Sequence, residues 1–203
     1  MWPGLTYFPD FHQPNTQRWW QENVELLYNE VKFDGLWIDM NEPSSFIDMD
    51  CPENHLNHPP WKPMSNQLYS KTICPSYFHG TIRHYNLHNL YGLDHAKATH
   101  LTLENMNNEV RPFLLSRSTS LTSGNWTAHW TGDNWSIWED IHISISQMFG
   151  LNLFGVTMVG ADVCGFTGRG MMTHQMTRTV WENPRPGNGD LFVRSNHFDD
   201  CCV

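Results

Sequence analysis

The sequence is poor in basic residues, with 12 Lys and Arg against 21 Asp and Glu among 203 residues and a formal net charge of −9. It has no run of Lys and Arg that could neutralise a phosphate backbone, which argues against a nucleic-acid partner. No window approaches the roughly 18 consecutive apolar residues of a membrane span. The first residues, Met-Trp-Pro-Gly, lack the charged start and apolar run of a signal peptide. We therefore expect no membrane segment and no leader in this chain.

Metal-ligand spacing is also missing. The histidines that could be considered as ligands are far apart or irregularly spaced, so we predict no metal and no other cofactor. They are His12, His55, His58, His79, His95 and His142.

Cysteines are few, five in all. Two of them, Cys51 and Cys74, lie in a loop rich in Pro, Asn and His, which suits a disulfide in an oxidising compartment. Closing a loop of that length would stabilise the fold by roughly 3 kcal/mol on the chain-entropy model. The glycosylation sequons that begin at Asn125 and Asn134 favour the same compartment.

Aromatic residues, in contrast, are abundant: 10 Trp, 11 Phe and 6 Tyr make up 13% of the chain. Many stand next to polar residues. A mixed aromatic and polar surface suits a sugar, whose C–H faces stack on rings while its hydroxyls form hydrogen bonds. The same count is equally compatible with a Trp-rich core.

Short apolar segments alternate with helical patterns along the chain. We predict strands at 36–40, 111–116, 129–133 and 156–162, helices at 86–106 and 138–149, and a long loop at 43–83. A further helix is expected from Asn15 onward, with Asn15 or Thr16 as its cap. Its apolar stripe would consist of Trp19, Val24, Leu27, Tyr28 and Val31. Such alternation predicts an α/β fold with a parallel sheet. We expect a partial (β/α)8 TIM barrel that contains about four of the eight strand-helix units.

Three acidic residues, Asp39, Asp133 and Asp162, end predicted strands. A single Asp at such a position is commonly a capping residue, but three on neighbouring strands indicate a site. Glycoside hydrolysis requires two carboxyl groups in different states of ionisation on either side of the scissile bond. The pattern therefore favours a carbohydrate-active site at the carboxyl ends of the strands.

The run around Asp39, Trp37-Ile38-Asp39-Met40-Asn41-Glu42-Pro43-Ser44, resembles the signature of glycoside hydrolase family 31. Members of that family include lysosomal acid α-glucosidase and intestinal maltase and sucrase. Six further runs occur in the family's order between Trp2 and Phe166, which makes the resemblance specific. They are Trp2-Pro3-Gly4, Phe8-Pro9-Asp10-Phe11, His84-Tyr85-Asn86-Leu87-His88-Asn89-Leu90-Tyr91-Gly92, Ser116-Arg117-Ser118-Thr119 together with His129-Trp130-Thr131-Gly132-Asp133, and Gly160-Ala161-Asp162-Val163-Cys164-Gly165-Phe166.

The resemblance implies a role for each matching residue. Asp39 would be the catalytic nucleophile and Asp133 the general acid and base, with their carboxyl groups about 5–5.5 Å apart as in retaining enzymes. Glu42 would belong to the catalytic group as an orienting residue. The implied substrate-binding residues are Met40, Arg117, Trp130, Asp162, Phe166 and His197.

After Phe166 the family pattern weakens, and Met176 stands where the family has the cysteine partner of Cys164. Cys164 is therefore expected to be free or paired with Cys201 or Cys202. The family also has an N-terminal β-sandwich, earlier barrel strands and C-terminal β-domains, so we predict that residues 1–203 are a fragment of the catalytic barrel.

By this resemblance the chain would belong to an enzyme that hydrolyses terminal α-linked glucose from maltose-like oligosaccharides, in the lysosome or outside the cell. Its partners would be the α-glucoside oligosaccharide and the missing segments of the same enzyme. α-Xylosidase and the glucan-processing glucosidase of the secretory pathway are alternatives within the family. The alternative of another class is an inactive truncated or carbohydrate-binding remnant.

Overall fold

The computed structural model describes residues 6–62, 67–107, 109–135, 137–163 and 165–166. The chain divides into two compact units, residues 1–130 with 151–159 and residues 131–150 with 160–203, and each is described by itself. The helices are α1 (Pro14–Glu30), α2 (His84–Leu87), η1 (His88–Leu90), α3 (Tyr91–Met106), η2 (Ser123–Asn125) and α4 (Trp138–Leu153). The strands are β1 (Gly35–Ile38), β2 (Phe78–His79), β3 (Ile82–Arg83), β4 (Phe113–Ser116), β5 (Ala128–Trp130) and β6 (Val159–Gly160).

The main sheet has the strand order β1-β4-β5-β6, which is the order of these strands in the sequence. Strand β1 pairs with β4 in parallel, from Gly35 opposite Phe113 to Ile38 opposite Ser116. Strand β4 pairs with β5 in parallel. Parallel neighbours require a crossover between them, and α3 supplies it between β1 and β4. The predicted parallel α/β sheet is confirmed, although β6 is shorter than the predicted strand at 156–162.

Helix α3 covers one face of this sheet. Because side chains alternate along a strand, Ile38 and Leu114 point to the same face, where they pack with Ala96 of α3. Leu36 and Trp126 pack against this cluster. The helix predicted at 86–106 is divided at its start into α2, η1 and α3.

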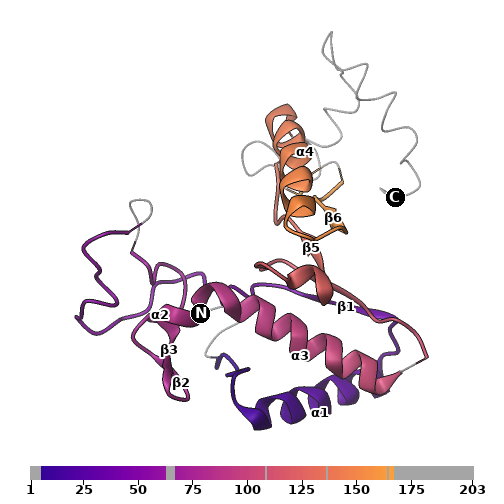
Figure 1. Ribbon diagram of the computed structural model, residues 1–203, viewed down its shortest axis with the longest axis horizontal. Coiled ribbons are helices and arrows are strands. Elements are labelled where there is room, and N and C mark those ends of the chain that lie inside the picture. The colour runs from indigo at the N-terminus through magenta and orange to yellow at the C-terminus, as the bar shows by residue number, and fades with distance from the viewer. Residues whose placement is uncertain (1–5, 63–66, 108, 136, 164, 167–203) are drawn as a thin grey trace. The chain divides into compact units, whose positions relative to one another are not determined.

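Helix α1 lies beside α3 (Figure 1). It begins at Pro14, whose fixed φ suits the first turn and whose missing N–H has no partner to lose there. The predicted cap at Asn15 or Thr16 is wrong, since Gln13 precedes the helix without a side-chain cap bond.

The predicted apolar stripe of α1 is confirmed at Val24, which is the buried residue of the helix, and is wrong for three of its other members. Trp19, Leu27 and Val31 are 47–60% exposed. The helix instead meets α3 through Gln17 and Trp20, which lie three residues apart on one face. Trp20 Nε1 donates to Thr99 Oγ1 at 3.0 Å, and Gln17 Nε2 donates to the carbonyl of Ala98 at 2.9 Å. The covered face of α1 therefore carries the buried Val24 together with two side chains that are hydrogen-bonded to α3.

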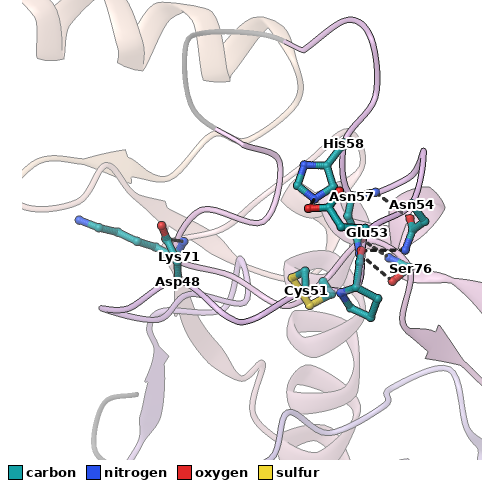
Figure 2. The surroundings of a disulfide bond; sticks show 10 residues. Asp48, Cys51, Glu53, Asn54, Asn57, His58, Lys71 and Ser76 are labelled. Atoms are coloured by element: carbon teal, nitrogen blue, oxygen red, sulfur yellow. Dashed lines mark hydrogen bonds and ion pairs between the residues drawn. A yellow bond between two sulfur atoms is a disulfide. The ribbon is translucent and has the colours of Figure 1, made fainter.

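The long loop after β1 is held by the predicted disulfide, which is confirmed between Cys51 and Cys74 with a Cα–Cα distance of 5.6 Å. Figure 2 shows the side-chain amides beside it. Asn57 is fully buried and donates to the carbonyl of Pro52 at 2.7 Å, while its Oδ1 accepts from the Ser76 amide at 2.9 Å. A loop has no regular backbone hydrogen bonds of a helix or sheet, so these side-chain bonds satisfy its buried polar groups instead.

The prediction that all of residues 43–83 is loop is wrong at its end, where β2 and β3 form an antiparallel hairpin. Gly80 in its turn has φ +57°, a conformation that glycine adopts at no steric cost. The hairpin fixes the direction in which α2 begins.

Within the described ranges no helix is long and apolar enough to cross a membrane. The two sequons differ in accessibility. Asn125 is exposed, whereas the Nδ2 of Asn134 donates to the carbonyl of Asp162 at 3.4 Å. Asn125 is therefore the more accessible of the two as a glycan acceptor.

Candidate active site

The carboxyl ends of β1 and β4 bring Asp39 and Arg117 together. Each residue directly follows its strand, and the strands are in register there because Ile38 is opposite Ser116. The Arg117 amide donates to the Ile38 carbonyl at 3.3 Å and continues the pairing past the strand end. The Nη1 of Arg117 lies 3.2 Å from Oδ1 of Asp39. Parallel pairing thus places a cation beside the predicted nucleophile.

Arg117 also holds Glu42 through two parallel bonds, Nε to Oε1 and Nη2 to Oε2, both at 2.9 Å. This fork is the geometry in which guanidinium and carboxylate pair most specifically. One guanidinium therefore bridges two carboxylates, and each carboxylate limits where the other can lie.

Asn41 links the carboxyl ends of β1 and β4. It is only 3% exposed. Its Nδ2 donates to Ser116 Oγ at 2.8 Å, and its Oδ1 accepts from the Ser118 amide at 2.9 Å. The buried amide thereby fixes the turn after β1 against the turn after β4, on either side of the Asp39–Arg117 pair.

The backbone is strained immediately after Asp39. Met40 has φ +54°, in the left-handed region that residues other than glycine rarely enter. Its amide donates to Asp39 Oδ1 at 2.7 Å, and its carbonyl accepts from the Ser44 amide at 2.8 Å. Such conformations cost about 1–3 kcal/mol and are common at functional sites. Here the strained turn directs the Asp39 carboxylate, whose side chain is 31% exposed.

Two tryptophans lie on the sheet face that carries Asp39. Trp37 precedes Asp39 by two residues on β1, and alternation puts both side chains on the face away from α3. Trp37 is 56% exposed and meets the buried Trp130 of β5 edge to face, with ring centroids 5.1 Å apart. Next to Trp130, His129 Nδ1 is hydrogen-bonded to Thr119 Oγ1 at 2.9 Å, and burial lowers the pKa of His129. The aromatic residues thus contribute to both an exposed face and the core.

Asp133 and Asp162 belong to the second unit. Asp133 borders a hollow of about 190 Å³, whose other lining residues include Asn134, Asp140 and Gln147. Asn134 joins the two acidic loops, because its side chain donates to Asp162 O at 3.4 Å and its carbonyl accepts from the Phe166 amide at 2.8 Å. Both predicted carboxylates therefore lie on loops that are linked to each other.

Phe166 is 68% exposed. His197 and Cys164, with Met176, Cys201 and Cys202, lie outside the described residues. No group of three or more His, Cys, Asp or Glu side chains in the described part of the chain could hold a metal ion.

Residues 1–195 match the family model of the glycosyl hydrolases family 31 TIM-barrel domain. The chain belongs to this family. The barrel architecture predicted from the sequence is thereby confirmed, and the parallel sheet is part of such a barrel. In these barrels the chemistry lies at the carboxyl ends of the strands, which is where Asp39 and Arg117 meet.

Named relatives are similar over most of this chain. Lysosomal alpha-glucosidase of Bos taurus is 49% identical over 173 residues, which cover 83% of the chain and 18% of the relative. Probable maltase-glucoamylase 2 of Homo sapiens is 39% identical over 203 residues, 94% of the chain and 8% of the relative. A crystal structure of glucosidase II alpha subunit bound to Glc1Man2 superposes with a TM-score of 0.67 at 28% identity, over 83% of this chain and 17% of that one. The chain thus spans less than a fifth of the length of these relatives.

The sequence did not assign a role to Asn41 or to a hydrogen-bonded row of three histidines, His79, His84 and His88. Asn41 stands inside the family run around Asp39, so its position was a signal. His79 was considered only as a metal ligand and rejected. It is in fact bonded to Asp10 and to His84, whose sequence runs carried the resemblance.

Proposed function

We propose that this chain carries the nucleophile and the acid/base residue of a retaining α-glucosidase. The observation that supports the proposal best is the Arg117 guanidinium between Asp39 and Glu42 at the carboxyl ends of adjoining parallel strands. The guanidinium pairs with both carboxylates, and the accessible Asp39 side chain is the one that could reach a substrate. Relatives named as alpha-glucosidases support the reaction class.

In the first step Asp39 attacks the anomeric carbon and forms a glycosyl ester as the bond to the leaving oxygen breaks. Asp133 donates its proton to that oxygen, so that the leaving sugar departs as a neutral alcohol. In the second step Asp133 takes a proton from water, the water oxygen attacks the anomeric carbon, and the Asp39 carboxylate leaves. Two inversions give retention. A separation of about 5–5.5 Å between the two carboxyl groups stays a prediction.

The substrate is proposed to be the terminal glucose of a maltose-like oligosaccharide. Asp162 and Arg117 would bind the sugar hydroxyls, and Trp130, Met40 and Phe166 would contact its C–H faces. Relatives named lysosomal alpha-glucosidase and intestinal sucrase-isomaltase support a location in the secretory pathway. The remaining barrel strands and β-domains are proposed to come from other segments of the same enzyme.

The test compares Asp39→Asn with Asp34→Asn in the full-length protein that carries this chain. Asp34 is an exposed acid five residues earlier, just before β1. We expect Asp39→Asn to abolish release of glucose from maltose, since the amide is a poor nucleophile. Asp34→Asn should keep it.

Asp133→Ala separates the acid step from the nucleophilic step. It should slow maltose hydrolysis much more than hydrolysis of an aryl α-glucoside with a good leaving group, because the latter needs little protonation. If Asp39→Asn retains wild-type activity, the nucleophile assignment is wrong. A wild-type protein that binds maltose without hydrolysing it would favour the carbohydrate-binding remnant.

A further inference from the structure

The sequon that begins at Asn125 lies immediately before β5 and is divided between the surface and the core. Asn125 is the last residue of η2 and is exposed. Trp126 is half-buried, and Thr127 is only 8% exposed. N-glycosylation requires an Asn and a Ser or Thr two residues later. The folded protein therefore presents the acceptor residue to solvent but encloses the hydroxyl residue of the same sequon.

The hydroxyl of Thr127 is engaged within the sheet. Its Oγ1 donates to the carbonyl of Leu114 on β4 at 3.1 Å, and the carbonyl of Ala128 lies 2.8 Å from the same oxygen. A hydroxyl has one proton, which these two carbonyls share. The Thr127 amide donates to the carbonyl of Ser123 at 3.0 Å, so the backbone is held as well. Pairing of β5 with β4 thus removes the sequon hydroxyl from any enzyme that must recognise it.

The turn that carries Asn125 is fixed by residues on either side of it. Ser123 is fully buried, and its Oγ accepts from the Ser120 amide at 2.9 Å. Trp126 packs against the core cluster between the sheet and α3. The Asn125 amide donates to the carbonyl of Thr122 at 3.1 Å. The turn is therefore anchored through its buried members, and the Asn125 side chain is left at the surface.

Asn125 lies at the amino ends of the strands. It borders a hollow of about 300 Å³ together with Arg111 and Pro112, which directly precede β4. Asp39 and Arg117, in contrast, follow the carboxyl ends of β1 and β4. Because these strands are parallel, the two sets of residues lie at opposite edges of the sheet. The hollow leaves open space beside Asn125, and a sugar attached there stays away from the Asp39–Arg117 pair.

We propose that Asn125 carries an N-linked glycan that is attached before β5 joins the sheet. The inference rests on the secretory-pathway location in the proposed function, because the co-reactant is a lipid-linked oligosaccharide diphosphate of that pathway. The Asn125 amide nitrogen forms a bond to the anomeric carbon of the donor sugar, and the bond from that carbon to the diphosphate oxygen breaks. The lipid diphosphate leaves with the electron pair, and the amide nitrogen releases one of its two protons. Folding then encloses Thr127 and leaves the glycan outside.

The second sequon, at Asn134, is expected to stay unmodified in the active protein. The Nδ2 of Asn134 donates to the carbonyl of Asp162 at 3.4 Å. Asn134 also lines the hollow of about 190 Å³ that Asp133 borders. A glycan on that nitrogen would fill the hollow beside the proposed acid/base residue. Asn134 is therefore an internal control for Asn125.

The test is site-specific mass spectrometry of the full-length protein expressed in cultured animal cells. Peptide N-glycosidase in heavy-oxygen water converts a glycosylated Asn into a labelled Asp, and chymotryptic cleavage after Trp130 separates the two sequons. We expect the label at Asn125 and not at Asn134. An unlabelled Asn125 in protein that contains the Cys51–Cys74 disulfide would overturn the proposal.

Three variants assign the glycan to this sequon. Asn125→Gln should remove one glycan and increase electrophoretic mobility, whereas Asn134→Gln should leave the mobility unchanged. Thr127→Ser retains a hydroxyl and should retain the glycan. Since the chemistry of such barrels lies at the other edge of the sheet, Asn125→Gln should keep kcat and KM for maltose within about twofold. Unchanged mobility of Asn125→Gln, or an equal shift in Asn134→Gln, would contradict the assignment.

The order of events is tested with unglycosylated full-length protein, a purified oligosaccharyltransferase and its lipid-linked donor. The protein is added either folded or freshly diluted from urea. We expect Asn125 to be modified only in the second reaction, because Thr127 is enclosed in the folded sheet. Equal modification in both reactions would show that folding does not hide the sequon. No modification in either reaction would exclude Asn125 as an acceptor.

Failure of the proposed function gives a different result. A protein that carries no label and has Cys51 and Cys74 as free thiols did not enter the secretory pathway, which contradicts the proposed location and the glycan with it. A protein that has the disulfide and the glycan at Asn125 but does not hydrolyse maltose contradicts the enzymatic proposal and supports the glycan site.

Discussion

His95 on α3 provides a test of how burial controls the acid stability of this fold. Its ring stacks on Phe11 with centroids 4.7 Å apart and meets the edge of Trp20 at 4.9 Å. Both ring nitrogens are shielded from solvent and have no hydrogen-bond partner among the described residues. Burial accordingly lowers the pKa of His95 to about 4.

The sign of the pH effect follows from proton binding. The ordinary pKa of a histidine in an unfolded chain is 6.5, so below that pH the unfolded chain takes up a proton that the folded protein excludes. Stability conferred by the neutral ring is complete above pH 6.5 and is lost as the pH falls toward 4. At about 1.4 kcal/mol per pH unit, the loss from this residue reaches about 3 kcal/mol.

The perturbation is His95→Phe, which keeps an aromatic ring against Phe11 and Trp20 and removes the two nitrogens. It should raise the free energy of unfolding by about 1–3 kcal/mol near pH 7, because two unbonded buried polar atoms disappear. It should also remove about 2 kcal/mol of the decrease in the free energy of unfolding that the wild-type protein shows between pH 6.5 and about pH 5.

The assay is urea unfolding of the full-length protein from about pH 7 to pH 5, with His142→Phe as the control. His142 is exposed on α4, so its substitution should leave the pH dependence unchanged. A wild-type slope in His95→Phe would refute the reasoning, since it would mean that the ring is charged or hydrogen-bonded in the folded protein.

Two other predictions concern stability. A Cβ on Gly124 would lie 1.9 Å from the carbonyl oxygen of Gly155, so Gly124→Ala should create a backbone clash. The loss of stability should be several times larger than the roughly 1 kcal/mol by which Gly and Ala differ in helix propensity. Gly150→Ala, where a Cβ meets nothing within 4 Å, should be neutral or stabilising in the same thermal melts. Replacing Cys51 and Cys74 by Ser opens a link over 23 residues and should cost roughly 3 kcal/mol. An unchanged melting temperature together with two free thiols in the wild-type protein would exclude that contribution.

Local patterns along the chain were sufficient to predict the parallel α/β sheet, the disulfide and the residues at the strand ends. Asp39 and Arg117 could be named in advance because each follows an apolar strand within a family run, and the ends of parallel strands lie at one edge of a sheet. The disulfide could be predicted because both cysteines lie in the same loop. Each of these predictions depends on residues that are close in the sequence or on the order of the family's motifs along the chain.

Tertiary structure alone decided which face of α1 is covered. The apolar stripe predicted that Trp19, Leu27 and Val31 are covered, but the covered face contains Val24 beside Gln17 and Trp20. The latter two are hydrogen-bonded to α3. Periodicity within one helix carries no information about polar partners on its neighbour, so the error could not be detected from the sequence.

The same reason applies to the contacts within the site. That Arg117 holds Glu42 as well as Asp39 depends on a strained turn at Met40 and on the register of two strands. The hydrogen-bonded row of Asp10, His79, His84 and His88 joins segments up to 69 residues apart. The sequence determined which chemical groups are present, and only the packing of β2, α2 and η1 determined that they bond in a row, because hydrogen bonding between side chains depends on distances that the spacing of residues does not encode.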